Sequence, residues 1–291
     1  MTYWEDHLKK RTVTLRDGTI LPCLGQGTWH MGENPMKKAE EVKALQRGID
    51  LGMTVIDTAE MYGEGESERV VGEAVKDRRD NVFLVSKVYP HNAGTETIKT
   101  ACENSLKRMG TEYVDLYLLH WRGGVPLEET VEGMEKLKAE GKIKRWGVSN
   151  FDINDMKELR NLNYGSNCAT NQVLYHLSSR GIEFDLLPCQ EEHHMPVMAY
   201  CPLAQGGMLR KQLITHPVIQ EIAKNHEAKP LQIALAWTIR KNQIISIPKA
   251  GQENHVIDNA AAAGIELTIE EQNQLDSAFP PPSRKTPLDI I

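Results

Sequence analysis

This chain of 291 residues carries a formal net charge of −6, and that acidic balance argues against a dedicated nucleic-acid binder. Its 40% hydrophobic and 25% charged residues are typical of a globular protein, and no apolar run approaches the ~18 residues of a membrane span. The polar start of the chain lacks a signal-peptide pattern, and its five irregularly spaced cysteines favour a reducing cytoplasm over a disulfide framework.

The first predicted element is a β-hairpin, followed by eight strand-like runs that alternate with helical patterns. Thr12–Leu15 and Ile20–Pro22 flank Arg16–Thr19, where Asp-Gly is a strong turn signal. The predicted strands are Leu24–Thr28, Met53–Thr58, Val82–Val88, Val114–His120, Arg145–Ser149, Ala169–Val173, Val197–Pro202 and Ile244–Lys249. The helical patterns between them include Ala39–Leu51, Glu68–Lys76, Thr97–Met109 and Leu127–Glu140.

This alternation predicts an α/β fold, a closed (β/α)8 barrel in which the opening hairpin plugs one end. Two apolar-periodic segments, Pro217–Asn225 and Leu231–Arg240, lie between the last two strands, and we expect one of them to be an extra helix. Glu270–Ala278 is a further predicted helix near the end of the chain. No linker or repeat divides the sequence, so we expect one domain over residues 1–291. A doubly wound open sheet is the alternative, but the hairpin fits it less well.

Ionisable residues stand at or after the ends of three neighbouring strands. Asp57 ends the second strand, Lys87 the third and His120 the fourth, and Tyr62 follows Asp57 in the next loop. The carboxyl ends of barrel strands share one face, which is where active sites lie. A lysine that closes an apolar run is costly unless paired, and Asp57 is its evident counter-ion. We expect this pair to lower the pKa of Tyr62 and make it an acid/base near neutral pH.

Each of these residues has a simple structural reading when taken singly. The lysine could lie at a strand end where its ammonium reaches solvent. The histidine could be a core residue whose ring nitrogens are hydrogen-bonded. Four ionisable groups on one predicted face favour an active site, in which His120 hydrogen-bonds a substrate oxygen.

Three local motifs carry a resemblance to a known family: Ile56-Asp57-Thr58-Ala59-x-x-Tyr62-Gly63, Val85-Ser86-Lys87 and Leu119-His120-Trp121. With them the chain resembles aldo-keto reductases, from the hairpin to about Asn259. The resemblance implies that a hydride passes from a nicotinamide to the carbonyl carbon of an aldehyde or ketone. It implies further that Tyr62 protonates the oxygen, that Lys87 and Asp57 tune Tyr62, and that His120 orients the carbonyl.

The nicotinamide site lacks a Rossmann fingerprint, because no Gly-x-Gly-x-x-Gly follows a strand. The resemblance implies that Ser149, Asn150 and Gln172 bind the carboxamide and that Tyr200 stacks on the ring. It also assigns cofactor contacts to Gly27, Thr28, Trp29, Asp57, Pro202 and Leu203.

The adenosine end of the cofactor is expected after the eighth strand. The resemblance assigns Lys249 to the 2′-phosphate, and Asp258 and Asn259 to the adenine. Ala250 stands where the family often has a serine, and His255 where it often has an arginine. A neutral histidine cannot replace a bidentate arginine, which narrows the expected preference for NADPH over NADH. The charge of Lys249 still favours the phosphate, so we expect NADPH as cofactor, with NADH possible but weaker.

The substrate pocket is expected to be apolar and partly aromatic, formed by Trp29, Tyr62, His120 and Trp121. The tail after Pro282 has only nine residues, so we expect an open pocket and broad use of aldehydes, including small dicarbonyls such as methylglyoxal. No pattern in the sequence reveals the oligomeric state, and we expect a monomer. Cys189 and His193–His194 lack two further ligands, and no metal site is expected.

Two other functions stay open. Lys87 could form a Schiff base in a lyase, although Asp57 beside it would keep the amine protonated. The second is a non-catalytic subunit that senses nicotinamide, which the complete acid/base set disfavours.

Overall fold

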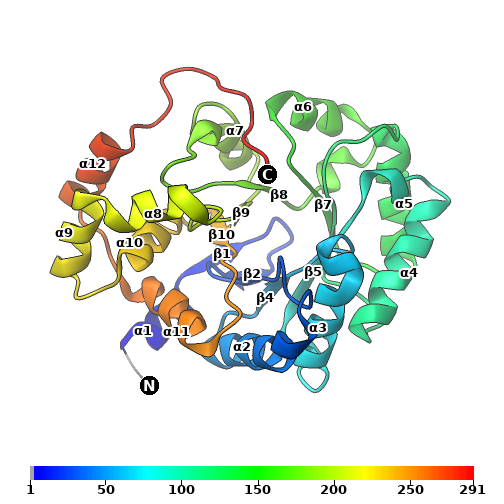
Figure 1. Cartoon of the computed structure of the whole chain (residues 1–291). Helices are drawn as coiled ribbons and strands as arrows, with labels where there is room; N and C mark the ends of the chain where they lie inside the picture. The colour runs from blue at the N-terminus through cyan, green and yellow to red at the C-terminus, as the bar shows by residue number, and fades with distance from the viewer. Residues whose placement is uncertain (1–2) are drawn as a thin grey trace.

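Eight parallel strands form the centre of the molecule in a computed structural model that describes residues 3–291, with side chains described from His7 onward (Figure 1). Their order in the sheet follows the chain. Parallel bridges join Leu24 to Ser246 and Gly27 to Lys249, which brings the first strand against the last. The predicted barrel is therefore confirmed. The strands are β3 (Gln26–Gly27), β4 (Val55–Asp57), β5 (Phe83–Val88), β6 (Leu116–Leu119), β7 (Trp146–Ser149), β8 (Asn171–Leu174), β9 (Val197–Tyr200) and β10 (Ile244–Ser246).

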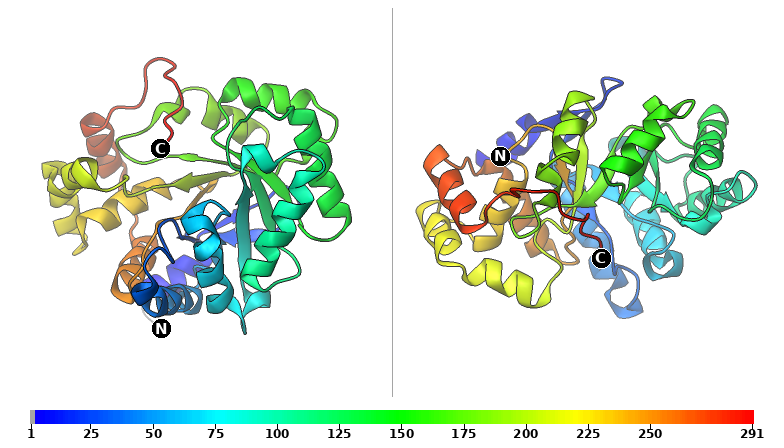
Figure 2. Two further views of the ribbon diagram at one scale, coloured as in Figure 1. Left: turned by 45° about the vertical axis from the view of Figure 1, so that its right-hand side comes forward. Right: turned by 90° about the horizontal axis from the view of Figure 1, so that it is seen from above.

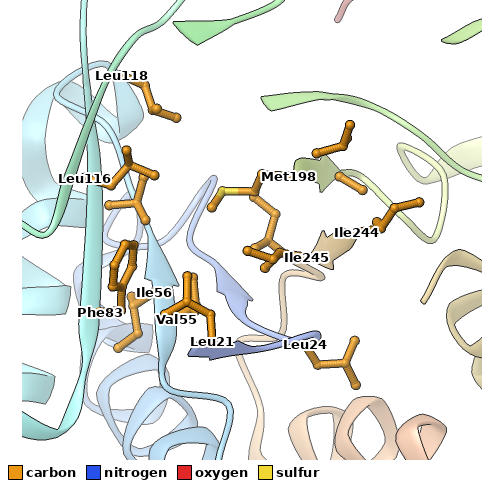
Figure 3. Close-up of a cluster of buried hydrophobic side chains, with 14 of the residues drawn as sticks. Leu21, Leu24, Val55, Ile56, Phe83, Leu116, Leu118, Met198, Ile244 and Ile245 are labelled. Carbon is orange, nitrogen blue, oxygen red and sulfur yellow. The ribbon is translucent and has the colours of Figure 1, made fainter. Parts of the chain in front are cut away.

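The strands are buried on both faces, which explains their uninterrupted apolar sequences. Every residue of β4 and β5 is buried. Figure 3 shows buried side chains of several strands, among them Val55, Phe83, Leu116 and Ile245, that belong to the hydrophobic core. Apolar side chains fill the interior of the barrel, and Asp57 and Ser149 are the last residues of β4 and β7.

The hairpin is present as predicted, with β1 (Thr12–Thr14) paired to β2 (Ile20–Pro22). Gly18 in its turn has a φ of 86°, a conformation that glycine adopts without a steric penalty. Leu21 is buried and belongs to the hydrophobic core, part of which is drawn in Figure 3. The hairpin thus covers the end of the barrel opposite the predicted site.

Helices surround the barrel, and several begin or end where the sequence indicates. Asp152 and Asp155 form the capping box that opens α6, and Gly110 ends α4 with a left-handed backbone. The helices are α2 (Lys38–Leu51), α3 (Glu66–Val75), α4 (Thr97–Met109), α5 (Leu127–Ala139), α6 (Ile153–Asn161), α7 (Leu186–Glu192), α9 (Pro217–Asn225), α10 (Pro230–Thr238), α11 (Glu253–Ala261) and α12 (Ile269–Ala278). Short 3₁₀ turns lie at Pro35–Lys37, Tyr62–Gly65, Arg79–Asn81, Pro90–Asn92, Gly165–Asn167, Gly181–Glu183 and Ala262–Gly264.

Two helices fall outside the predicted alternation of strands and helices. α1 (Tyr3–Lys10) precedes the hairpin, and α8 (Gly207–Thr215) adds a third helix between β9 and β10 where two segments were expected. α8 buries only Leu213, so it has no apolar stripe for a periodicity to reveal. Within the described part of the chain, no helix is both long and apolar enough to cross a membrane.

Candidate active site

The four ionisable residues predicted from the strand ends meet at the carboxyl end of the barrel. Asp57 ends β4, Lys87 lies near the end of β5, and His120 follows β6. Tyr62 lies in the 3₁₀ turn after β4. Lys87 is 0%, Asp57 2% and His120 6% exposed, so water contributes little to solvating their charges. The structure thus brings the predicted set together in a site largely shielded from solvent.

The ammonium of Lys87 is the centre of this group. It donates to Asp57 Oδ2 at 2.7 Å, to the carbonyl oxygen of Thr58 at 2.8 Å and to the Tyr62 hydroxyl at 3.1 Å. Gln172 Nε2 donates to the second carboxylate oxygen of Asp57 at 2.7 Å. All three protons of the ammonium therefore have acceptors, which offsets the cost of burying the charge.

The electrostatics of Tyr62 contradict the sequence prediction. Burial raises the pKa of Tyr62 well above its ordinary value, and the nearby Asp57 carboxylate raises it further. The sequence indicated that charges would be adjacent, but not that burial would have the largest effect on the pKa of the hydroxyl. At neutral pH the phenol is therefore protonated, which is the form that donates a proton.

His120 is a neutral imidazole in this site. Burial lowers its pKa to about 2, and the positive charge of Lys87 acts in the same direction. Its ring meets the Tyr62 ring edge-on, with centroids 5.7 Å apart. Nδ1 is buried and has no hydrogen-bond partner among the described residues. A neutral imidazole has one N–H, so His120 is able to donate one hydrogen bond to a substrate oxygen.

A cavity of about 530 Å³ opens beside these residues. Most of the predicted nicotinamide and substrate residues line it, but Pro202 and Leu203 do not. The lining residues predicted from the sequence are Gly27, Thr28, Trp29, Asp57, Tyr62, His120, Trp121, Ser149, Asn150, Gln172, Tyr200 and Lys249. Further lining residues, outside the predicted site set, are Met61, Arg122, Asp155, Cys201, Ile247, Ile290 and Ile291.

Hydrogen bonds connect the polar residues predicted to bind a carboxamide. The Ser149 hydroxyl donates to the carbonyl oxygen of Gln172 at 2.9 Å, and the Tyr200 hydroxyl donates to Asn150 Oδ1 at 2.8 Å. Asn150 Nδ2 in turn donates to the carbonyl oxygen of His120 at 3.1 Å. Asn150 has a φ of 59°, an uncommon backbone conformation that these contacts hold in place. The wall of the cavity is therefore preformed.

The predicted adenosine-binding residues are divided between two cavities. Lys249 lines the catalytic cavity, whereas His255, Asp258 and Asn259 line a second one of about 260 Å³. Lys229 Nζ donates to both carboxylate oxygens of Asp258, at 2.7 and 2.6 Å. The carboxylate predicted to meet an adenine is thus already paired. Ala250 is buried and lines neither cavity.

The end of the chain corrects the prediction of an open pocket. The tail runs from α12 to the centre of the barrel mouth (Figures 1 and 2). Lys285 donates to Asp152 at 3.0 Å and to Asp185 at 2.8 Å, and the Ser179 hydroxyl donates to Asp289 at 2.5 Å. Ile290 and Ile291, which follow, form part of the cavity wall. Sequence spacing carries no signal for such a contact, because the tail has no periodic pattern.

Metal-binding geometry is not found in the described residues, which contain no cluster of three or more histidine, cysteine, aspartate or glutamate side chains suited to a metal. All five cysteines are free thiols.

Comparisons with known proteins agree on one family. The family model described as Aldo/keto reductase family matches residues 23–279. Methylglyoxal reductase YeaE of Escherichia coli (strain K12) is 53% identical over 284 residues, which cover 98% of this chain and 100% of that protein. Glyoxal reductase of Bacillus subtilis (strain 168) is 34% identical over 271 residues, 92% of each chain. A crystal structure of an aldo/keto reductase from Klebsiella pneumoniae with NADP and acetate has a TM-score of 0.95 and 55% identity, covering 97% of this chain and 99% of that one.

Proposed function

The chain belongs to the aldo/keto reductase family, and from this we propose that it reduces small dicarbonyls such as methylglyoxal, with Tyr62 as the proton donor. The enzyme is an oxidoreductase that reduces carbonyl groups with NADPH. The observation that carries the assignment of Tyr62 is its hydroxyl, which lies 3.1 Å from the buried Lys87 ammonium at the wall of the catalytic cavity. The names of the Escherichia coli and Bacillus subtilis relatives support a small dicarbonyl as substrate.

The residues of the catalytic cavity fit the nicotinamide half of the cofactor. Tyr200 offers an aromatic ring, while Ser149, Asn150 and Gln172 provide a hydroxyl and two amides close to it. A ring with a carboxamide substituent needs this combination of a flat apolar surface and a few fixed polar groups. When bound, the nicotinamide supplies the hydride that reduces the carbonyl carbon.

Tyr62 completes the reduction by giving its proton to the carbonyl oxygen. As the carbon gains a hydride, the π electrons of the C=O bond move to the oxygen, which takes the Tyr62 proton and becomes a hydroxyl. The resulting phenolate faces the Lys87 ammonium, which stabilises the negative charge as it develops. Neutral His120 donates its N–H to the same substrate oxygen and holds it near Tyr62.

The shape of the cavity supports a small substrate. Trp29, Met61 and Trp121 provide apolar walls, and Ile290 and Ile291 add to this apolar lining. Such a pocket binds a short carbonyl compound between apolar side chains and leaves its oxygen to the polar residues.

The Schiff-base lyase is the weaker alternative, because Lys87 would have to lose a proton to attack a carbonyl. Its ammonium donates to Asp57, Thr58 and Tyr62, and these contacts favour the charged form. We also propose that the enzyme works as a monomer in a reducing cytoplasm, since this chain alone supplies the site and its cysteines are free.

Turnover of purified protein with NADPH tests the proposed function. Loss of NADPH absorbance with methylglyoxal, at a higher kcat/KM than with bulky aromatic aldehydes, is the expected result. NADPH binding without turnover of any carbonyl compound would contradict catalysis. Inactivation by borohydride in the presence of substrate, without NADPH consumption, would support the lyase.

A further inference from the structure

A group of basic side chains lies at the amino end of the barrel, on the side of the hairpin. Arg16, in the turn between β1 and β2, and Arg160, in the last turn of α6, line one cavity of about 300 Å³. Cys168 and Met195 also line it, and they stand just before β8 and β9. The cavity is therefore at the opposite end of these strands from the catalytic cavity.

Both arginines have unused hydrogen-bonding capacity. Arg16 Nη1 donates to the carbonyl oxygen of Ser166 at 2.9 Å, and Arg160 Nη1 donates to Cys189 Sγ, a weak acceptor, at 3.9 Å. Among the described side chains, no ion pair includes either arginine. A guanidinium has five N–H groups, so each arginine retains donors for a ligand.

The helix ends at this face account for only part of the basic character. The helix dipole favours cations near a C-terminus, and Arg160 lies in such a position. Arg16 belongs to no helix, and the hydrogen bonds of both arginines go to atoms other than the terminal carbonyls of α6 and α7. Few interactions within the chain therefore compete with an anionic ligand for these two side chains.

A neighbouring cavity of about 470 Å³ extends the basic surface, and the two cavities share four lining residues, among them Arg16. Of its further cations, Arg145 is paired with Asp17 at 2.6 Å. The Lys144 ammonium instead lies over the ring of Tyr113, 4.3 Å from its centroid, and has no carboxylate partner among the described side chains. Three cations without a carboxylate partner thus line two cavities that meet at Arg16, although the chain carries a net charge of −6.

We propose that these two cavities form a binding site for a small molecule that carries a diphosphate, separate from the catalytic cavity. Arg16 and Arg160 hold one phosphate group between their planar guanidinium groups, which match phosphate oxygens, and Lys144 meets the second group as a point charge. Glu192, which also lines the first cavity, repels an anion there and weakens the site. None of these residues lines the catalytic cavity, so the site does not depend on carbonyl reduction.

Calorimetric titration with inorganic pyrophosphate tests the site, on enzyme saturated with NADPH so that the groups that bind the cofactor's own phosphates are occupied. At about 0.15 M salt, where charges far from the ligand are screened, the wild type should bind pyrophosphate. Arg16→Met and Arg160→Met should each raise its Kd about tenfold, because each removes a hydrogen bond between charged groups. Lys157→Met is the matched control and should stay within about twofold of the wild type, since Lys157 is exposed on α6 and lines neither cavity.

No binding of pyrophosphate to the wild type, or equal binding to the wild type and both arginine variants, would overturn the proposal. An equal loss in Lys157→Met would also overturn it, because the anion would then respond to net charge alone. Arg16 is exposed in the hairpin turn, so Arg16→Met keeps the test decisive even if Arg160→Met does not fold.

Two further variants test the charges from opposite directions. Glu192→Gln removes the opposing carboxylate and should lower the Kd of pyrophosphate about threefold. Lys144→Met should raise the Kd of pyrophosphate about threefold and leave that of inorganic phosphate within about twofold of the wild type, because a single phosphate group is held by the arginines alone. Weaker binding to Glu192→Gln, or equal effects of Lys144→Met on both anions, would contradict a diphosphate that spans the two cavities.

Discussion

Lys87 carries its charge in a site shielded from water, so its three acceptors decide whether that charge is tolerated. Burial lowers the pKa of Lys87 and raises that of Asp57, and each partner's charge offsets part of the effect on the other. The pair is therefore stable only as long as both members are present.

Lys87→Met keeps the bulk of the side chain and leaves Asp57 buried beside Gln172 alone. We expect a loss of roughly 3–5 kcal/mol in the free energy of unfolding, because removing one partner of a buried ion pair strands the other charge. Asp57→Asn should cost less, since an amide oxygen still accepts from the ammonium. Urea denaturation measures the stability and steady-state assays the activity. The pairing account is wrong if Asp57→Asn is as damaging as Lys87→Met in both respects.

For single residues, the sequence predicted which side chains form the site but not the direction of the pKa shift of Tyr62. Asp57, Lys87 and His120 were predictable because ionisable residues at the ends of apolar strands are rare and share one face of a barrel. The pKa of Tyr62 was not, because its direction depends on how completely the hydroxyl is buried.

Among the elements, the strands and most helices follow from periodicity, whereas the tail and α8 do not. α4 and α9 have the predicted bounds, since their apolar residues recur with a helical period over the whole segment. The tail is held by side-chain contacts from Lys285 and Asp289 to distant elements. Such contacts depend on the folded arrangement and leave no local pattern in the sequence.

Ile290→Ala should enlarge the catalytic cavity, because Ile290 forms part of its wall. We expect the ratio of kcat/KM for a bulky aromatic aldehyde to that for methylglyoxal to rise about tenfold, because a few methyl groups in an apolar pocket change discrimination by this amount. Ile269→Ala is the matched control, since Ile269 is 72% exposed on α12 and does not line the cavity. If this ratio of kcat/KM values were the same in Ile290→Ala and Ile269→Ala, the tail would have no part in substrate selection.

For the molecule as a whole, two buried histidines make stability depend on pH. Burial lowers the pKa of His176 to about 4 and that of His120 to about 2. Both histidines bind protons below pH ~6.5 in the unfolded chain, but not in the folded one. Stability is thus full above pH ~6.5 and falls as the pH drops toward 4, by about 1.4 kcal/mol per pH unit for each histidine.

His176→Gln should make this slope shallower by about 1.4 kcal/mol per unit between pH 6 and 4.5. His91→Gln serves as the control, because His91 is exposed. Denaturation at several pH values measures both variants. An unchanged slope in His176→Gln would mean that His176 is charged in the folded state.

The barrel could be predicted as a whole because eight strands, each followed by a helix, can form few other folds. The closure between β3 and β10 explains how residues from Gly27 to Lys249 share one cavity. The expectation of one domain over residues 1–291 stays a prediction.

The central claim is that Tyr62 donates the proton, and Tyr62→Phe tests it most directly. With NADPH and methylglyoxal, kcat should fall by ~10²–10⁴, the usual contribution of a general acid, while the Kd of NADPH stays within about twofold of wild type. His120 and Lys87 remain in place in this variant, so the loss would report the missing hydroxyl alone. Retention of kcat within about a factor of five would contradict the assignment of Tyr62.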